Sequence, residues 1–278
     1  MIAHLAGLTL FGLVVGSSAH TLADRLPPGR PLAWARSRCD SCARRLRFWE
    51  MIPVVSWLAL RGRCATCRAA LPRSLLAAEV LGGLLGAGIA GAVSDPLLAG
   101  FGVLLALPMG AIALIDARLG VVPDRLTLAL AVLALAWRAR ATFPSFPAFP
   151  LAAPEGAWLA GEGLAMAEQV LLPALGLGAL LGLGAWTLRA VHARLRGREG
   201  LGSGDVGLFA AAGVALPVET LPVFLIAAGL GGLLTALVLP GRDNGVPFAP
   251  ALMAALALGM GHATLTGGYE PSFSVLSP

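Results

Sequence analysis

Eight apolar runs, most of them close to 20 residues long and almost free of charge, divide this chain of 278 residues. A helix needs about 20 apolar residues to cross the hydrocarbon core of a bilayer. Charged residues make up 13% of the chain, against about 25% in soluble domains, and 57% of the chain is apolar. This composition excludes a soluble domain and a disordered chain. The sequence therefore predicts an all-α polytopic membrane protein with about eight transmembrane helices, at residues 2–22, 75–94, 97–115, 119–137, 169–188, 204–218, 220–240 and 246–266.

The distribution of arginine predicts how these spans are oriented. The chain has 20 basic residues, all of them Arg, and only Arg138 and Arg140 belong to one of the two faces. The other face holds 18, in the segments 23–74, 116–125, 189–203 and 241–245. Cytoplasmic loops are enriched in basic residues. We therefore expect these four segments in the cytoplasm, and both termini and the segment 140–168 on the opposite side.

Two other interpretations of the N-terminal third are less favoured. Residues 2–22 could be a cleaved signal peptide, but they lack a basic start, and the arginine-rich segment after them would have to cross the membrane. The same arginines could form a nucleic-acid-binding patch. Orientation of the spans explains them more simply, so we expect a lipid bilayer as partner and no nucleic acid.

The only four cysteines of the chain form two Cys-x-x-Cys pairs in the segment 23–74, namely Cys39, Cys42, Cys64 and Cys67. Four thiolates in this pattern can close a tetrahedral shell around a structural zinc ion. Disulfides are disfavoured in a reducing cytoplasm, and a redox pair would not need a second copy. The sequence therefore predicts a small cytoplasmic zinc-binding domain. The apolar stretch 52–58 between the pairs would form its core or lie on the membrane surface.

Two aspartates lie at the predicted cytoplasmic ends of spans, where charged residues are candidates for function. Asp116 follows the run 97–115, and Asp205 follows Gly202-Ser203-Gly204. Helix ends at the same depth of a bundle can bring two such carboxylates together. Asp124 would be about 12 Å from Asp116 on one continuous helix, and we expect it to begin a helix and cap it with its carboxylate.

A pair of aspartates in such a place can act as acid and base. Two like charges a few ångströms apart cannot both ionise easily, so one proton is shared between them. The ionised carboxyl can then activate water while the protonated one donates to a carbonyl oxygen, as in aspartic proteases. Gly202 and Gly204 would let a backbone approach closely. Taken singly, Asp205 could only cap the sixth span and Asp116 could only mark a loop. Taken together with the glycines, they are better explained as a catalytic pair, so we predict that Asp116 and Asp205 are the catalytic residues of a membrane protease.

Several motifs together make the chain resemble the type IV prepilin leader peptidases, which are membrane aspartic proteases of the GxGD type. They are spread over most of the predicted cytoplasmic face: Gly16-Ser17, Arg25-Leu26-Pro27, the two cysteine pairs, Ile52-Pro53, Ser56-Trp57-Leu58, Leu60-Arg61-Gly62-Arg63-Cys64, Glu79, Ile115-Asp116, Val122-Pro123-Asp124 and Gly202-Ser203-Gly204-Asp205.

The resemblance implies a protein of the bacterial inner membrane with periplasmic termini. It would cleave the basic leader of prepilins or pseudopilins, for type IV pili or type II secretion, at the cytoplasmic face. It also implies, for many members with four cysteines, S-adenosylmethionine-dependent methylation of the new N-terminus, to which Glu79 is a candidate contributor. The expected organisation is a first transmembrane helix (1–22), the zinc-binding domain (23–74) and a seven-helix membrane protease domain (75–278).

One position departs from the family pattern, because Gly207 stands where a lysine is usual two residues after the second aspartate. Its loss would alter how the proton is shared or how substrate docks. A noncatalytic zinc-bearing assembly subunit of a pilus or secretion system is therefore an alternative. A proton-coupled transporter is another, but it would place acidic groups near the bilayer midplane. The sequence leaves open the individual substrate, methyl transfer and the oligomeric state.

Overall fold

The computed structural model describes residues 1–27, 37–143, 165–197, 200–238 and 246–269. Within these ranges the regular structure is helical, and no strand is present, only two isolated β-bridges. The predicted all-α class is therefore confirmed. The chain forms two compact units, Met1–Leu114 and Ile115–Pro278.

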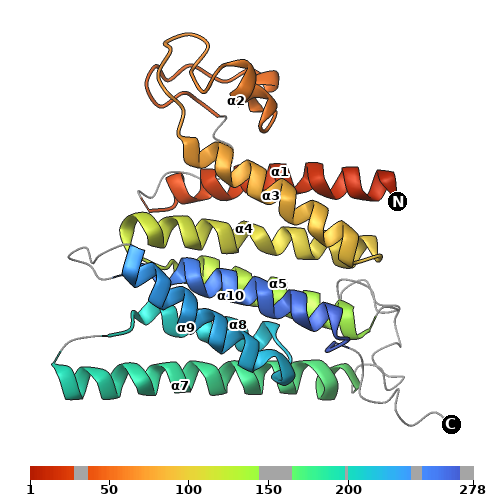
Figure 1. The fold of residues 1–278 in the computed structure, drawn as a ribbon, viewed down its shortest axis with the longest axis vertical. Coiled ribbons are helices and arrows are strands. Elements are labelled where there is room, and N and C mark those ends of the chain that lie inside the picture. Colours follow the sequence, from red (N-terminus) through yellow and green to blue (C-terminus); the bar gives the residue numbers. More distant parts are fainter. Residues whose placement is uncertain (28–36, 144–164, 198–199, 239–245, 270–278) are drawn as a thin grey trace. The chain divides into compact units, whose positions relative to one another are not determined.

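The N-terminal unit is built on two apolar helices, α1 (Ile2–Arg25) and α3 (Arg73–Ala92), which lie side by side in Figure 1. A Cβ atom added to the glycines that face each other across this pair would collide with a backbone carbonyl group of the facing helix. Each helix carries two of these glycines, four residues apart: Gly12, Gly16, Gly82 and Gly86. Small residues at this spacing let membrane helices pack backbone to backbone, so these glycines fix α1 against α3.

A small domain without strands connects α1 to α3. We call residues 37–72 the four-cysteine domain; it contains the 3₁₀ turn η1 (Phe48–Met51) and the short helix α2 (Val55–Ala59) between the two Cys-x-x-Cys loops. Figure 1 shows it at the end of the helix pair where α3 begins. Most of its backbone hydrogen bonds join residues less than ten positions apart.

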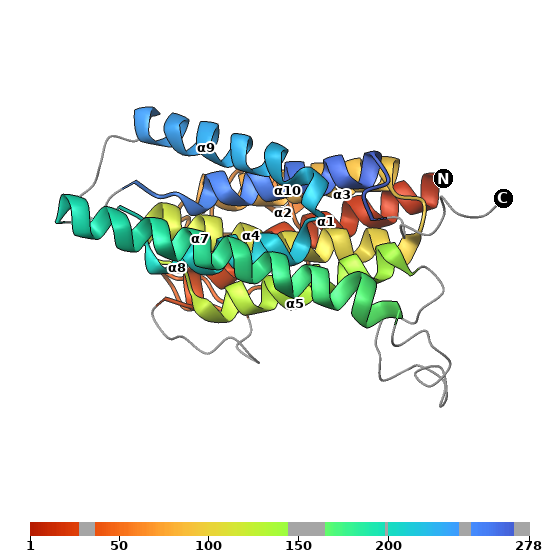
Figure 2. The same ribbon diagram turned by 90° about the horizontal axis from the view of Figure 1, so that it is seen from below.

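The C-terminal unit begins with the last residues of α4 (Pro96–Leu119). Figure 2 shows α7 beside α8 and α9 beside α10, and α5 also packs on α8. Shorter turns, η3 (Ala167–Leu171) and η4 (Val218–Thr220), precede α7 and α9. The longer helices are α5 (Asp124–Thr142), α7 (Leu172–Arg196), α8 (Ser203–Ala215), α9 (Leu221–Val238) and α10 (Ala249–Leu265).

The two shortest of these helices are the most enclosed. Nine of the 17 residues of α10 are buried, whereas only Phe224 and Ala228 are buried among the 18 of α9. The last carbonyl groups of α8 are held by buried side chains, since Arg138 donates to the Leu216 oxygen at 3.0 Å and Tyr269 donates to the Ala215 oxygen at 3.1 Å. A helix surrounded by protein does not need the length of a lipid-facing span.

The apolar runs predicted helices more reliably than they predicted spans. A helix overlaps each of the eight runs, but only five in the described part of the chain are long and apolar enough to cross a membrane. Three of these helices fall outside the five. Helices α8 and α10 are shorter, with 13 and 17 residues, and α5 has 19 residues but carries Arg125, Arg138 and Arg140. Eight spans therefore stay a prediction. The five candidates are Ile2–Arg25, Arg73–Ala92, Pro96–Leu119, Ala167–Arg196 and Val218–Val238.

The predicted start of the fourth run, at residue 119, is wrong by five residues. Helix α4 continues to Leu119, Gly120 follows with a φ of +66°, and α5 begins only at Asp124. Asp124 thus begins a helix as predicted. Its predicted capping role is wrong, because Pro123 is the cap residue and no side-chain hydrogen bond caps α5. The segment expected outside, 140–168, falls for the most part outside the described residues.

Candidate active site and metal centre

Asp116 connects two helices that are far apart in the sequence. It lies in the last turn of α4, its side chain is buried, and its Oδ2 accepts a hydrogen bond of 2.8 Å from the backbone amide of Ala249. The amide of Phe248 also donates to it. Ala249 is the first residue of α10, so the carboxylate satisfies amides at the positive end of this helix. The contact spans 133 residues of chain.

Asp205 lies in the first turn of α8. The helix begins at Ser203 with Gly202 as its cap residue, so Asp205 is its third residue. Its carboxylate accepts a hydrogen bond from the Gly202 amide. Asp205 therefore supports the start of α8 from within the helix, without being the cap residue itself.

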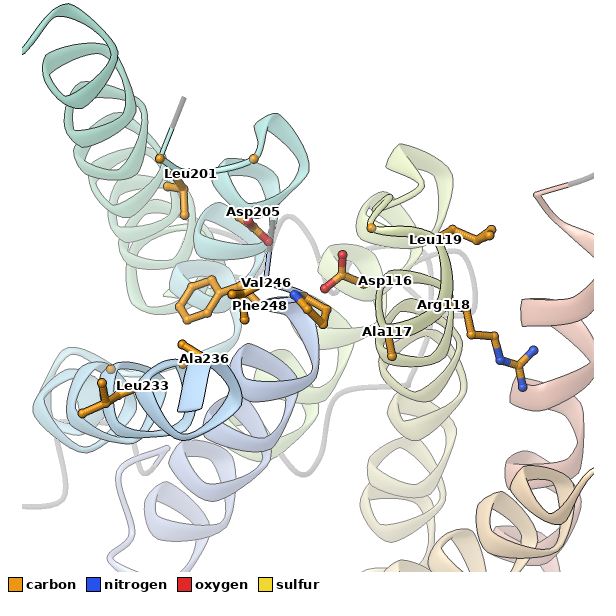
Figure 3. A pocket seen from close by; sticks show the side chains of 16 residues that line it. Asp116, Ala117, Arg118, Leu119, Leu201, Asp205, Leu233, Ala236, Val246 and Phe248 are labelled. Carbon is orange, nitrogen blue, oxygen red and sulfur yellow. The ribbon is translucent and has the colours of Figure 1, made fainter. Parts of the chain in front are cut away.

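The two carboxylates line one cavity of about 550 Å³. Figure 3 shows Asp116 and Asp205 on different walls, both directed into it, and the two side chains interact electrostatically. The walls come from four segments: the end of α4 with Gly120, the residues before α8, one face of α9, and the residues before α10. Much of the surface facing the aspartates is apolar, with Leu233, Ala236 and Phe248 among the lining residues. The structure thus brings the two predicted catalytic residues into the same cavity.

Gly204 sets how closely α8 approaches the turn after α4. A Cβ atom at this position would lie 2.5 Å from the Cβ of Val122. Val122 lies in the connection between α4 and α5, three residues after Leu119, the last residue of α4. The glycine therefore allows the start of α8, with Asp205, to pack against the chain that follows Asp116.

Gly207 and Asp124 lie away from this cavity. A Cβ atom at Gly207 would be 3.3 Å from Thr127 Cγ2 on α5. Both Gly207 and Asp124 line a separate groove of about 450 Å³ between α5, α7 and α8. A longer side chain at 207 would enter this groove. The position at which the family pattern has a lysine thus lines the groove that Asp124 also lines, and it does not line the cavity that holds the aspartate pair.

The four cysteine sulfurs form a compact cluster. All four Sγ atoms lie within 4.8 Å of one another, and those of Cys39 and Cys67 are 3.8 Å apart. Cys39 and Cys64 are buried, while Cys42 and Cys67 are exposed. Each residue offers one ligand atom, so the cluster could hold one metal ion.

The two cysteine loops are copies of one hairpin, a repeat that the sequence contained and that was missed. In each loop the first cysteine donates its amide to the carbonyl five residues on, at 2.9 Å for both Cys39 and Cys64. A second bond closes each hairpin, from Leu46 to Ser37 and from Leu71 to Gly62. The signal is the pattern Arg-Cys-x-x-Cys-x-x-x-Leu, present at 38–46 and again at 63–71.

The ionisation of the cysteines reflects their close approach. The amides of Cys67 and Thr66 bond to the Cys64 sulfur and lower the pKa of Cys64 to about 6. Cys67 accepts a bond from the Ala69 amide, but partial desolvation of its sulfur within the cluster and the neighbouring sulfurs raise the pKa of Cys67 to about 11. Four thiolates at this spacing repel one another, and a bound cation relieves that repulsion.

Glu79 lies in the N-terminal unit and does not line the aspartate cavity. It is buried in α3, where it accepts hydrogen bonds from the Ser17 hydroxyl at 2.8 Å and the Val54 amide at 2.6 Å. The family resemblance includes Glu79, but nothing in the sequence links it to Val54.

Two family descriptions match the chain over most of its length. Residues 10–92 match the bacterial peptidase A24 N-terminal domain, which includes the four cysteines. Residues 103–237 match the type IV leader peptidase family, and this range includes both Asp116 and Asp205.

Similar bacterial proteins are named prepilin leader peptidase/N-methyltransferase. One from Burkholderia pseudomallei (strain 1026b) is 32% identical, over 90% of this chain and 82% of the relative. One from Dickeya chrysanthemi is 33% identical over 92% of both chains. One from Dichelobacter nodosus is 33% identical over 79% of this chain and 68% of the relative. No solved structure matches the chain.

Proposed function

Since this chain belongs to the type IV leader peptidase family, we propose that it is an aspartic endopeptidase that removes the basic leader of prepilins or pseudopilins at the cytoplasmic face of the inner membrane. The observation that carries the proposal is the cavity lined by both Asp116 and Asp205. Each carboxylate is anchored by a backbone amide from the start of a helix. Two anchored carboxyl groups facing one space are what acid and base catalysis requires.

The reaction follows from one shared proton. The ionised carboxyl of the pair removes a proton from water, and the water oxygen attacks the carbonyl carbon of the scissile peptide bond. The protonated carboxyl gives its proton to the carbonyl oxygen. Collapse of the tetrahedral intermediate breaks the C–N bond, with proton transfer to the leaving amine. No covalent bond forms between enzyme and substrate.

The lining of the cavity suits a substrate in which a basic segment meets an apolar one. The acidic side chains attract the basic leader. Leu233, Ala236 and Phe248 offer an apolar surface beside them for the hydrophobic segment that follows. The arginine distribution of 18 against two supports a cytoplasmic position for this end of the helices.

The four-cysteine domain is proposed to hold structural zinc through Cys39, Cys42, Cys64 and Cys67. A tetrahedral shell with Zn–S bonds of about 2.3 Å separates its sulfurs by about 3.8 Å. The separation of 3.8 Å between the sulfurs of Cys39 and Cys67 fits this shell. Four protein ligands leave no open position, so zinc would stabilise the domain and take no part in hydrolysis.

Methylation of the new N-terminus is a second proposed activity, and S-adenosylmethionine would supply the methyl group when bound. The names of the relatives support it. No residue of this chain is assigned to that step. The mass of the first residue of the processed substrate distinguishes a methylated product from a free amine.

The proposal is tested by leader removal from a prepilin in membranes that contain the Asp116→Ala or Asp205→Ala variant. Each variant is expected to insert normally and to lose cleavage. Asp124→Ala is the matched control, because this carboxylate lines the neighbouring groove, and it should keep cleavage. Retained activity in either of the first two variants would reject the aspartate pair. A parent protein that binds prepilin but leaves its leader intact would favour the noncatalytic assembly subunit.

A further inference from the structure

The stretch between the two cysteine loops is not the core of its domain. Six of its large apolar side chains are exposed by between 39% and 78%: Phe48, Trp49, Met51, Ile52, Val55 and Leu58. A small domain that leaves this many apolar groups open needs an apolar surface to cover them. We refer to residues 48–58 as the apolar segment.

The apolar segment is held against α1 and α3 at a point some way along each helix from the end that adjoins the four-cysteine domain. The Val54 amide donates to Glu79, which also accepts from Ser17. Glu79 lies six residues after the start of α3 at Arg73, which is about 9 Å along a helix. Ser17 lies eight residues before the end of α1 at Arg25, or about 12 Å. Both helices are candidate spans. The polar layer on each side of a bilayer is only about 5–7 Å thick, so these depths reach the acyl chains.

The backbone of the apolar segment is hydrogen-bonded in a way that allows contact with lipid. Val54 has a φ of +61°, unusual for a β-branched residue, and it is the centre of a tight turn in which the Val55 amide donates to the Pro53 oxygen at 2.6 Å. The amides of Ser56 and Leu58 bond to carbonyl groups of the same segment. The Val54 amide is satisfied by Glu79. Backbone groups that meet lipid must be paired within the protein.

A basic and an aromatic side chain lie together at the beginning of the segment, as is common at a membrane interface. The Arg47 guanidinium lies 5.5 Å from the centre of the Trp49 ring. The four-cysteine domain carries further arginines, in both cysteine hairpins and between them, and this basic charge would repel a basic peptide. The same charge would attract anionic lipid headgroups.

We infer that the apolar segment is a membrane anchor that inserts between lipids beside α1 and α3, with Glu79 and Ser17 setting its depth. The occupant of the exposed apolar surface is the headgroup and upper acyl region of the leaflet next to the four-cysteine domain. Arginine and tryptophan at the rim of the segment then meet the lipid phosphates and the glycerol layer.

The inference is tested with the full-length, zinc-loaded protein in nanodiscs whose phospholipids carry bromine at a chosen depth. Bromine quenches tryptophan fluorescence on contact, and the difference between the parent and Trp49→Phe isolates the signal of Trp49. An interfacial group is buried about 5–10 Å, so bromine near the top of the acyl chain should quench Trp49 strongly and bromine near the chain end weakly. Equal zinc content shows that Trp49→Phe has kept its fold.

Two further variants make the result decisive. Trp186 on α7 is 58% exposed, and its quenching, obtained with Trp186→Phe, verifies that bromine reaches the protein. Quenched Trp186 beside unquenched Trp49 overturns the inference. Glu79→Ala releases the Val54 amide and should move Trp49 toward the headgroups, seen as weaker quenching by the acyl bromine. An unchanged depth in that variant overturns the part assigned to Glu79.

Discussion

Each hairpin of the four-cysteine domain is shaped by hydrogen bonds that span no more than nine residues, such as Leu46 to Ser37. The aspartate cavity depends instead on contacts between residues that are far apart in the sequence. Asp116 is positioned by Ala249, 133 residues away, and Asp205 depends on the packing of α8 against α5 and α7. One site is therefore determined by short sequence motifs and the other by the assembly of a helical unit. This difference predicts that each can be damaged without the other.

In the four-cysteine domain, removing the metal ligands should have the largest effect. In Cys39→Ser combined with Cys67→Ser, we expect loss of zinc and of its share of folding free energy, on the order of 10 kcal/mol for small zinc domains. The helices of the C-terminal unit should keep their structure. Metal content by mass spectrometry and helicity by circular dichroism measure the two results. Full stability without bound metal would contradict the structural role.

In the aspartate cavity, removing the charge of one carboxylate should have the largest effect. Asp116→Asn keeps the shape of the side chain but cannot act as a base, and positioned acid or base groups contribute about 100- to 10,000-fold in rate. We expect a loss of this size in leader cleavage with zinc content unchanged. A kinetic assay on purified protein measures the first and metal analysis the second. Parent-like cleavage by this variant would show that Asp116 is not needed.

A change in packing should weaken only the helical assembly. Gly204→Ala places a methyl group against Val122, and overpacking of this kind costs about 1–3 kcal/mol. We expect a lower midpoint of thermal unfolding and slower cleavage. Gly184→Ala is the matched control, since nothing lies within 4 Å of a Cβ atom there. Equal midpoints for the two variants would mean that α8 tolerates a wider spacing.

The smallest effect is expected inside the four-cysteine domain, where Arg44 donates to Glu50 at 2.7 and 3.1 Å. These bonds, with that from the Arg47 amide, lower the pKa of Glu50. The stabilisation is therefore present above the ordinary pKa of a glutamate and is lost as the pH falls through the lowered value. Glu50→Gln should lower the unfolding midpoint slightly at neutral pH. The difference from the parent, measured in a pH series, should vanish in acid; a constant difference would assign it to packing.

Local features of the sequence were enough to predict part of this molecule. Apolar runs predicted where helices form, and the spacing of Cys39, Cys42, Cys64 and Cys67 predicted a cluster, because both signals act over short distances. Hydropathy did not distinguish lipid-facing helices from enclosed ones, since lipid and protein interior are both apolar. For that reason the shorter helices α8 and α10 stay predicted spans, supported by hydropathy alone.

Other features depended on contacts between distant residues and could not be predicted. Nothing near Asp116 indicates that its partner is the amide of Ala249. The left-handed backbone of Val54 runs against the preference of a β-branched residue, and the contact with Glu79 accompanies it. The pairing of Asp116 with Asp205 was inferred from the common depth of two helix ends, and the cavity that both carboxylates line supports that inference.

The duplicated hairpin at 37–46 and 62–71 has a consequence for how such a domain could originate. One hairpin carries half of a tetrahedral set of sulfurs, so two separate identical peptides would complete it around a single ion. Joining the copies in tandem replaces a bimolecular encounter with an intramolecular one and raises the effective concentration of the second half. The residues between the hairpins can then change freely in sequence, because the two hairpins complete the metal shell without them.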